Sequence, residues 1–148
     1  MTKKIPMAFR LEALAHHLNI PQPMLKANTW GGIETKDEEW RVLTRQEADE
    51  AAREYIRESL WSFNPEFLLD YMPRRMTLRA VQQIQELYEN ANEPLTLLVG
   101  SRLSALMSDA IQLDGRGSFL SHYDGEEVKL TRHSEPSDRP HFFGYRLD

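Results

Sequence analysis

The strand-forming stretches of this chain lie near its two ends, and helical stretches fill most of the sequence between them. Residues 29–43, 128–131 and 141–146 are rich in the aromatic and β-branched residues typical of strands. Residues 44–113 repeatedly carry apolar residues at helical spacing. We therefore expect an α+β fold, in which a core of four to five helices lies beside a small antiparallel sheet formed by an N-terminal hairpin and the C-terminal strands.

Residues 1–28 are expected to form a short N-terminal helical segment. Apolar spacing predicts a helix over residues 8–18, and Pro21 ends it. Residues 11–26 superficially resemble a helix–turn–helix, which leaves a DNA-binding regulator as one alternative function. A recognition helix needs several side chains that contact phosphates and bases, and Lys26 is one of the few there that could do so. A small core helix is therefore the favoured interpretation.

A hairpin is expected after this segment. Trp30 and Ile33 are predicted to pair with Trp40 and Val42 across a turn near residues 36–37. This hairpin would supply the N-terminal part of the sheet.

The clearest start of a helix is the segment from Thr44 to Glu47. It is a capping box, in which the Thr44 side chain accepts a hydrogen bond from the Glu47 amide and the Glu47 carboxylate reaches back. The helix that follows is amphipathic, with charged residues on its outer face. Its apolar stripe consists of Ala48, Ala51, Ala52, Tyr55, Ile56 and Leu60.

Further helices are expected in the centre of the chain. Asn64 and Thr77 are predicted to cap two of them, and the helix after Thr77 is expected to bury Tyr88. A last long helix is predicted over residues 92–113, capped by Asn92 or by the glutamate that follows it. Gly100 lies in its interior, where a glycine would mark close helix packing.

The length and composition of the chain limit its class. At 148 residues we expect a single domain, residues 1–148, with a core large enough to need no cross-link. The absence of cysteine excludes disulfides and thiolate metal sites. The net charge of −5 disfavours nonspecific binding to nucleic acid. The N-terminus lacks a signal-peptide core, and the longest apolar run, residues 95–99, is too short for a membrane span, so we expect a cytoplasmic protein.

The stretch from Asp114 to Glu127 combines three glycines with many ionisable groups. Two specific loop types can be excluded there. An EF-hand alignment would place Arg116 among the calcium ligands and would lose three oxygen ligands. A phosphate-binding loop would open a helix and carry a lysine, whereas this stretch follows a helix and is rich in carboxylates.

Two interpretations of this stretch remain. Its carboxylates could hold a divalent cation with His122 as a base, which would give a small metal-dependent hydrolase or nuclease. Alternatively the residues are architectural: Arg116 pairs with a carboxylate, and a turn at residues 123–125 buries the Tyr123 ring before the last hairpin. We favour the second. The candidate polar cluster is Asp114, Arg116, His122, Tyr123, Asp124, Glu126 and Glu127.

The histidines offer little further chemistry. His16 and His17 are adjacent and cannot share a helix face, so one surface position and one position at the rim of the core are expected, and not a metal pair. His133 and His141 flank a loop over residues 134–140 that we expect to be flexible, and they could meet on a metal only with a third ligand, which the sequence does not show. No catalytic triad or other enzymatic signature is present. We therefore expect a protein that is not an enzyme and needs no cofactor or metal.

Several segments together resemble a known group of proteins. They are residues 42–50, 59–68, 114–127 and the terminal Tyr-Arg at 145–146. Over roughly residues 40–148 the chain resembles small proteins encoded by bacteriophages, prophages and other mobile elements.

The resemblance implies an accessory protein that works in the bacterial host cytoplasm and brings no catalytic residues with it. Many such proteins bind host proteins, including defence systems. We therefore expect a binding partner in the host, as for an anti-defence or host-takeover factor, and the exposed helix would also permit a homodimer.

Overall fold

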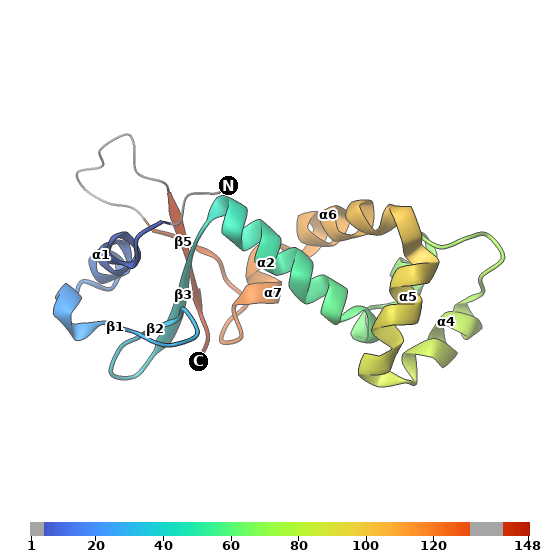
Figure 1. Ribbon diagram of the computed structural model, residues 1–148, viewed down its shortest axis with the longest axis horizontal. Helices are drawn as coiled ribbons and strands as arrows, with labels where there is room; N and C mark the ends of the chain where they lie inside the picture. The colour runs from blue at the N-terminus through green and yellow to red at the C-terminus, as the bar shows by residue number, and fades with distance from the viewer. Residues whose placement is uncertain (1–4, 131–140) are drawn as a thin grey trace. The chain divides into compact units, whose positions relative to one another are not determined.

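The structure is a computed structural model that describes residues 5–130 and 141–148 (Figure 1). It confirms the α+β class, with helices and one five-stranded antiparallel sheet. The chain divides into two compact units, which we call the sheet unit (residues 1–50 and 116–148) and the helical unit (residues 51–115). The single domain expected from the chain length stays a prediction, and the expected loop at 134–140 lies outside the described residues.

The sheet joins strands from both ends of the chain, as predicted. Its order is β1-β2-β3-β5-β4, with all neighbours antiparallel (Figure 1). The long central pair is β3 with β5, in register from Trp40 opposite Arg146 to Thr44 opposite Phe142. The strands are β1 (Lys26–Ala27), β2 (Ile33–Glu34), β3 (Glu39–Thr44), β4 (Val128–Leu130) and β5 (Phe142–Arg146).

The first helix, α1 (Met7–Leu18), packs against β3, β4 and β5. The core between them combines the apolar stripe of α1 with strand residues; β3 alternates buried and more exposed positions, whereas β5 is buried at four successive positions. Its buried members are Ala13, Leu14, Ala15, Leu25, Ile33, Trp40, Val42, Leu130 and Phe142. Both histidines of this helix are exposed.

The helix–turn–helix interpretation fails on the segment after α1. The next element, η1 (Gln22–Met24), is a single 3-10 turn, and β1 begins two residues later. Leu25 has extended backbone angles (φ −100°, ψ 141°) and Lys26 pairs with Glu34, so the turn passes directly into a strand and does not continue as an α-helix. The described segment therefore lacks a recognition helix.

The hairpin prediction is correct for Ile33, which pairs with Trp40 across the turn between β2 and β3. It is wrong for Trp30, which lies in the turn between β1 and β2 and is 88% exposed. Val42 pairs with Gly144 of β5 and not within the hairpin. The reason is that Asn28 closes a tight turn before β2 can start, which leaves β2 only two residues long.

The predicted capping box is present at the start of α2 (Arg45–Glu58). The Glu47 amide donates to Thr44 Oγ1 at 3.2 Å, and the Thr44 amide donates to Glu47 Oε1 at 2.9 Å. Ala48, Ala52 and Ile56 of its apolar stripe are fully buried. Both halves of the motif act within three residues, which explains why local sequence predicts it.

The helical unit consists of short helices. After α2 come η2 (Leu60–Ser62), α3 (Pro65–Leu69), α4 (Leu78–Gln85), η3 (Tyr88–Ala91), α5 (Asn92–Val99), η4 (Gly100–Arg102) and α6 (Leu103–Asp114). Buried apolar side chains come from almost every one of them: Ala52, Ile56, Leu60, Leu68, Met72, Val81, Ala91, Leu95, Val99, Leu106, Met107 and Ala110. Among the described residues, no helix is both long enough and apolar enough to cross a membrane.

Two of the helix starts in this unit are as predicted. Asn64 accepts from the Glu66 amide at 2.8 Å, and Thr77 accepts from the Ala80 amide at 3.1 Å. Two other expectations are wrong. Asn92 does not cap its own helix, because its side chain bonds the Trp61 amide and a carbonyl at the end of α2. Tyr88 is exposed, since its backbone has a positive φ of 55° that turns the chain after α4.

The long helix expected over residues 92–113 is two helices. Gly100 has φ 59° and ψ −129°, which ends α5, and α6 starts after a short 3-10 turn. A Cβ at Gly100 would have no atom within 4 Å, so close packing does not explain this glycine. Its role is the backbone conformation, which other residues adopt only at a cost.

Candidate functional site

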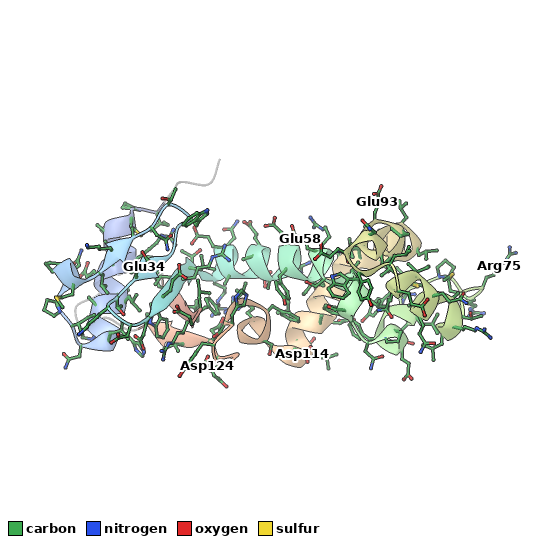
Figure 2. All side chains as sticks on the ribbon, turned by 90° about the horizontal axis from the view of Figure 1, so that it is seen from below. Glu34, Glu58, Arg75, Glu93, Asp114 and Asp124 are labelled. Atoms are coloured by element: carbon green, nitrogen blue, oxygen red, sulfur yellow. The ribbon has the colours of Figure 1, made fainter. Side chains whose placement is uncertain are left out.

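The polar cluster selected from the sequence does not fall in one unit. Asp114 is the last residue of α6 in the helical unit, and the other six members lie in the sheet unit (Figure 2). Gly115, with φ 81°, ends α6, and a short helix that the sequence did not predict, α7 (Arg116–Leu120), follows.

Arg116 and Glu127 form an ion pair, with Nε 2.8 Å from Oε1. The same carboxylate oxygen accepts a hydrogen bond from the Tyr145 hydroxyl of β5. Burial, and then this bond to a carboxylate, raise the pKa of the Tyr145 phenol, so the hydroxyl keeps its proton and donates. The pairing of Arg116 with a carboxylate is therefore architectural, as favoured from the sequence.

Arg116 also fixes the position of α7 against β5. Its guanidinium lies 4.8 Å from the centre of the Phe143 ring, and its Nη1 donates to the Arg45 carbonyl at 3.2 Å. Gly117 lies one residue further, where a Cβ would be only 2.5 Å from the Gly125 carbonyl oxygen. Because only hydrogen fits there, α7 and the turn that follows it come into direct backbone contact.

The Asp124 carboxylate accepts hydrogen bonds from residues of its own turn. Its Oδ1 accepts from the Glu126 amide at 3.0 Å and from the Ser121 hydroxyl at 2.9 Å. These two hydrogen bonds hold the pKa of the Asp124 carboxyl below its ordinary value. Ser121 is buried and also lies 2.8 Å from the Arg146 carbonyl, so the turn is tied to the end of β5.

The Tyr123 ring is not buried, which corrects the sequence-based expectation. It is 55% exposed, and the Arg146 guanidinium lies over it at 3.7 Å from the ring centre. Tyr145 is fully buried in its place, because β5 is central in the sheet while Tyr123 lies on a surface turn. His122 and Glu126 are both exposed side chains on the same turn.

Two carboxylates of this cluster, those of Glu127 and Asp124, make structural contacts. Glu127 is held by Arg116 and Tyr145, and Asp124 by its own turn. Over residues 5–130 and 141–148, no three His, Asp or Glu side chains gather as a metal would require. His133, the expected partner of His141, lies outside the described residues.

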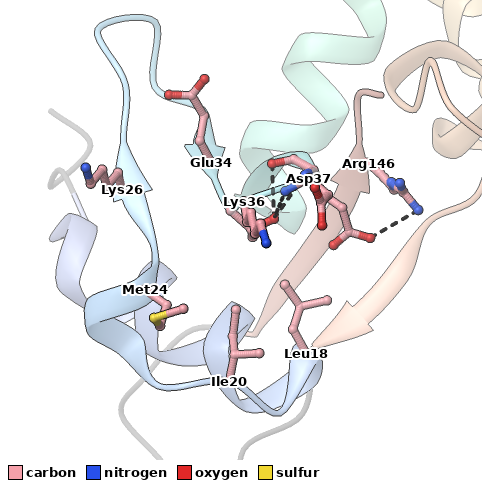
Figure 3. Close-up of a pocket in the computed structure, with 10 residues that line it drawn as sticks. Leu18, Ile20, Met24, Lys26, Glu34, Lys36, Asp37 and Arg146 are labelled. Atoms are coloured by element: carbon pink, nitrogen blue, oxygen red, sulfur yellow. Dashed lines mark hydrogen bonds and ion pairs between the residues drawn. The ribbon is translucent and has the colours of Figure 1, made fainter.

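A groove of about 800 Å³ opens elsewhere in the sheet unit (Figure 3). One wall is apolar, formed by Leu18, Ile20 and Met24. The other is polar, formed by Lys26, Glu34, Thr35, Lys36, Asp37, Glu38 and Arg146. Glu38 and Arg146 pair with each other at 3.1 Å. Since cations and carboxylates are equal in number on this wall, electrostatics selects no charged class of ligand.

Trp30 is the most exposed large apolar side chain among the described residues, whereas the sequence pattern predicts it in a strand. Asn28 organises its turn: Oδ1 accepts from the Trp30 amide at 3.0 Å and from the Gly32 amide at 2.8 Å. Its Nδ2 donates to Glu39 Oε2 at 2.7 Å, which ties the turn to β3. Asn followed within four residues by two glycines is a turn signal in the sequence, and it could have removed Trp30 from the strand.

Comparisons of this chain with protein-family models, with curated proteins and with solved structures give no match.

Proposed function

We propose that this protein is a non-enzymatic binding protein whose main contact residue is Trp30. The observation that carries the proposal is the 88% exposure of this side chain on a turn that several hydrogen bonds hold in one conformation. A large aromatic ring that stays exposed adds nothing to the stability of the fold, whereas burying it against a partner is favourable.

The turn makes Trp30 well suited to binding. Its backbone is already ordered by the Asn28 amide, which donates to the Gly32 carbonyl at 2.8 Å, and by the Gly31 amide, which donates to the Asn28 carbonyl at 3.2 Å. Binding would therefore cost little backbone entropy, and tryptophan is enriched among the residues that dominate interface energies.

The setting of this binding protein follows from the resemblance to phage, prophage and mobile-element proteins. We propose that it works in the cytoplasm of a bacterial host and that its partner is a host protein, as for an anti-defence or host-takeover factor. The metal-dependent hydrolase and the DNA-binding regulator stay untested predictions, and no contact among the described residues favours either.

The test is capture of a partner from bacterial lysate by the tagged protein and by its Trp30→Ala variant. Loss of a central tryptophan weakens binding by roughly tenfold or more, so the partner band should be lost. Folding should be unaffected, because the removed ring is exposed.

Leu97→Ala is the matched control, since Leu97 is 75% exposed and lies in the helical unit. It should capture the partner as the unmodified protein does. A lysate from which no stoichiometric partner depends on Trp30 would refute the proposal.

A further inference from the structure

Three arginines lie within six residues of one another around the start of α4. Arg74 and Arg75 follow Pro73, and Arg79 is the second residue of the helix. All three are exposed, and Figure 2 shows the Arg75 side chain extending away from the ribbon. We call them the arginine surface. They belong to the helical unit, in which every basic residue is an arginine.

The arginine surface differs from most of the other arginines of the chain in its contacts. Within the described ranges, none of its three members has a hydrogen-bond, ion-pair or ring partner. The engaged arginines, by contrast, pair with a carboxylate, a hydroxyl or an aromatic ring: Arg10, Arg45, Arg53, Arg102, Arg116 and Arg146.

The backbone holds this segment in place. The Met76 amide donates to the Pro73 carbonyl at 3.0 Å, which puts Arg74 and Arg75 at the two central positions of a turn. Thr77 then caps α4. The two arginines therefore project from an ordered turn, and their side chains are the parts left to be ordered by a partner.

Electrostatics within the protein does not explain these residues. The N-terminus of a helix carries a partial positive charge, which favours acidic residues there and disfavours cations. The first turn of α4 has no acidic residue and contains Arg79. Arg79 in this first turn opposes the helix dipole, and Arg74 and Arg75 in the turn before it make no contact with the described residues that would stabilise the fold.

We propose that the arginine surface binds a carboxylate-rich segment of a partner protein. Guanidinium groups bind carboxylates through paired, parallel hydrogen bonds, and the charges are complementary. A nucleic acid is disfavoured because its long, dense phosphate backbone would extend past the arginine surface and be repelled by the protein's net charge of −5. A short acidic segment bound to the arginine surface interacts mainly with charges within about 8–10 Å, which include the three arginines. This inference rests on the proposed protein-binding function and gives its partner an acidic segment.

The experiment uses the full chain and a fluorescein-labelled oligoglutamate peptide at an ionic strength of about 0.15 M, where charges beyond about 8 Å are screened. Binding is followed by fluorescence polarisation. Arg74→Ala/Arg75→Ala should weaken binding roughly fivefold, because each exposed ion pair contributes a few-fold. The matched double variant is Arg41→Ala/Arg57→Ala, which removes two exposed arginines of equal charge from elsewhere and should bind within about twofold of the unmodified protein.

A second arm tests the stability argument. Arg79→Glu places a carboxylate in the first turn of α4 and should raise the melting temperature by roughly 1–3 °C while it weakens peptide binding. A lower melting temperature would show that the arginine has a structural role and would overturn the argument.

A third arm replaces the peptide by a single-stranded oligodeoxynucleotide of equal charge. Weaker binding of the oligonucleotide supports an acidic protein segment. Equal or tighter binding that depends on Arg74 and Arg75 overturns the choice of partner, and equal peptide binding by the two double variants overturns the surface itself. None of these results depends on Trp30, so failure here is distinct from failure of the capture experiment.

Discussion

The Arg10 guanidinium forms two hydrogen bonds with the Glu47 carboxylate, 37 residues later in the chain, at 2.6 and 2.9 Å. Arg10 is buried in α1, and its Nη1 also donates to the Val42 carbonyl of β3 at 2.9 Å. Glu47 also completes the capping box of α2, so its carboxylate links the start of α2 to α1, the helix that packs against the sheet. The sequence identifies the capping box but not its partner.

Replacing Arg10 should destabilise the sheet unit. Arg10→Met keeps the length and apolar stem of the side chain but leaves the Val42 carbonyl and Glu47 without their donor. We expect a loss of about 1–3 kcal/mol in the free energy of unfolding, reduced from that of a fully buried pair because Glu47 is partly exposed. Urea unfolding measures it. Arg41→Met, at an exposed position of β3, should change stability by less than about 0.5 kcal/mol, and similar losses in both would contradict the assignment.

Acid should weaken the same contact. Burial alone would raise the pKa of Glu47, but the hydrogen bonds from Arg10 and the Thr44 amide outweigh it and hold the pKa below its ordinary value. Because the folded pKa is depressed, the stabilisation is complete above the unfolded pKa of about 4.3 and is lost as the pH falls below it through the folded pKa.

The Glu47→Gln variant tests this pH dependence. The difference in urea midpoint between the unmodified protein and the variant should be largest near neutral pH and should shrink below about pH 4. A difference that stays constant from neutral to acid pH would show that the Glu47 charge contributes nothing.

Gly117→Ala should disrupt the contact between α7 and the following turn. The added Cβ would lie 2.5 Å from the Gly125 carbonyl oxygen and 2.7 Å from two further backbone atoms, none of which is the end of a flexible side chain. We expect a loss of about 1–3 kcal/mol, measured by urea unfolding. Gly125→Asn is the control: its Cβ site is open, and asparagine tolerates the positive φ of 72°, so the loss should stay below about 1 kcal/mol.

Gly100→Ala should be costly although the space around Gly100 is open. The backbone there has φ 59° and ψ −129°, which an alanine adopts only with strain of about 1–3 kcal/mol. Ser101→Ala at the next, exposed position should change stability by less than about 0.5 kcal/mol. If Gly100→Ala instead stabilised the protein and raised its helical circular dichroism, α5 and α6 would be one helix, as the sequence pattern suggests.

The sequence by itself determined the features that depend on neighbouring residues. The capping box at Thr44 and the caps at Asn64 and Thr77 follow from hydrogen bonds within three residues. The strands near both ends follow from short runs rich in aromatic and β-branched residues. The pairing of Arg116 with a carboxylate, expected from the sequence, is present as the ion pair with Glu127.

Only the tertiary structure decided which partners and which surfaces these residues have. Apolar spacing continues through Gly100, so the break there is visible only in the backbone angles. Tyr145 and not Tyr123 is buried, because Tyr145 lies on β5, which is paired on both sides, whereas Tyr123 lies on a surface turn. The turn that carries Trp30 is tied to β3 by Glu39, which lies eleven residues after Asn28 and accepts a hydrogen bond from its side chain. Contacts between distant residues arise from the packed fold as a whole, and no local pattern encodes them.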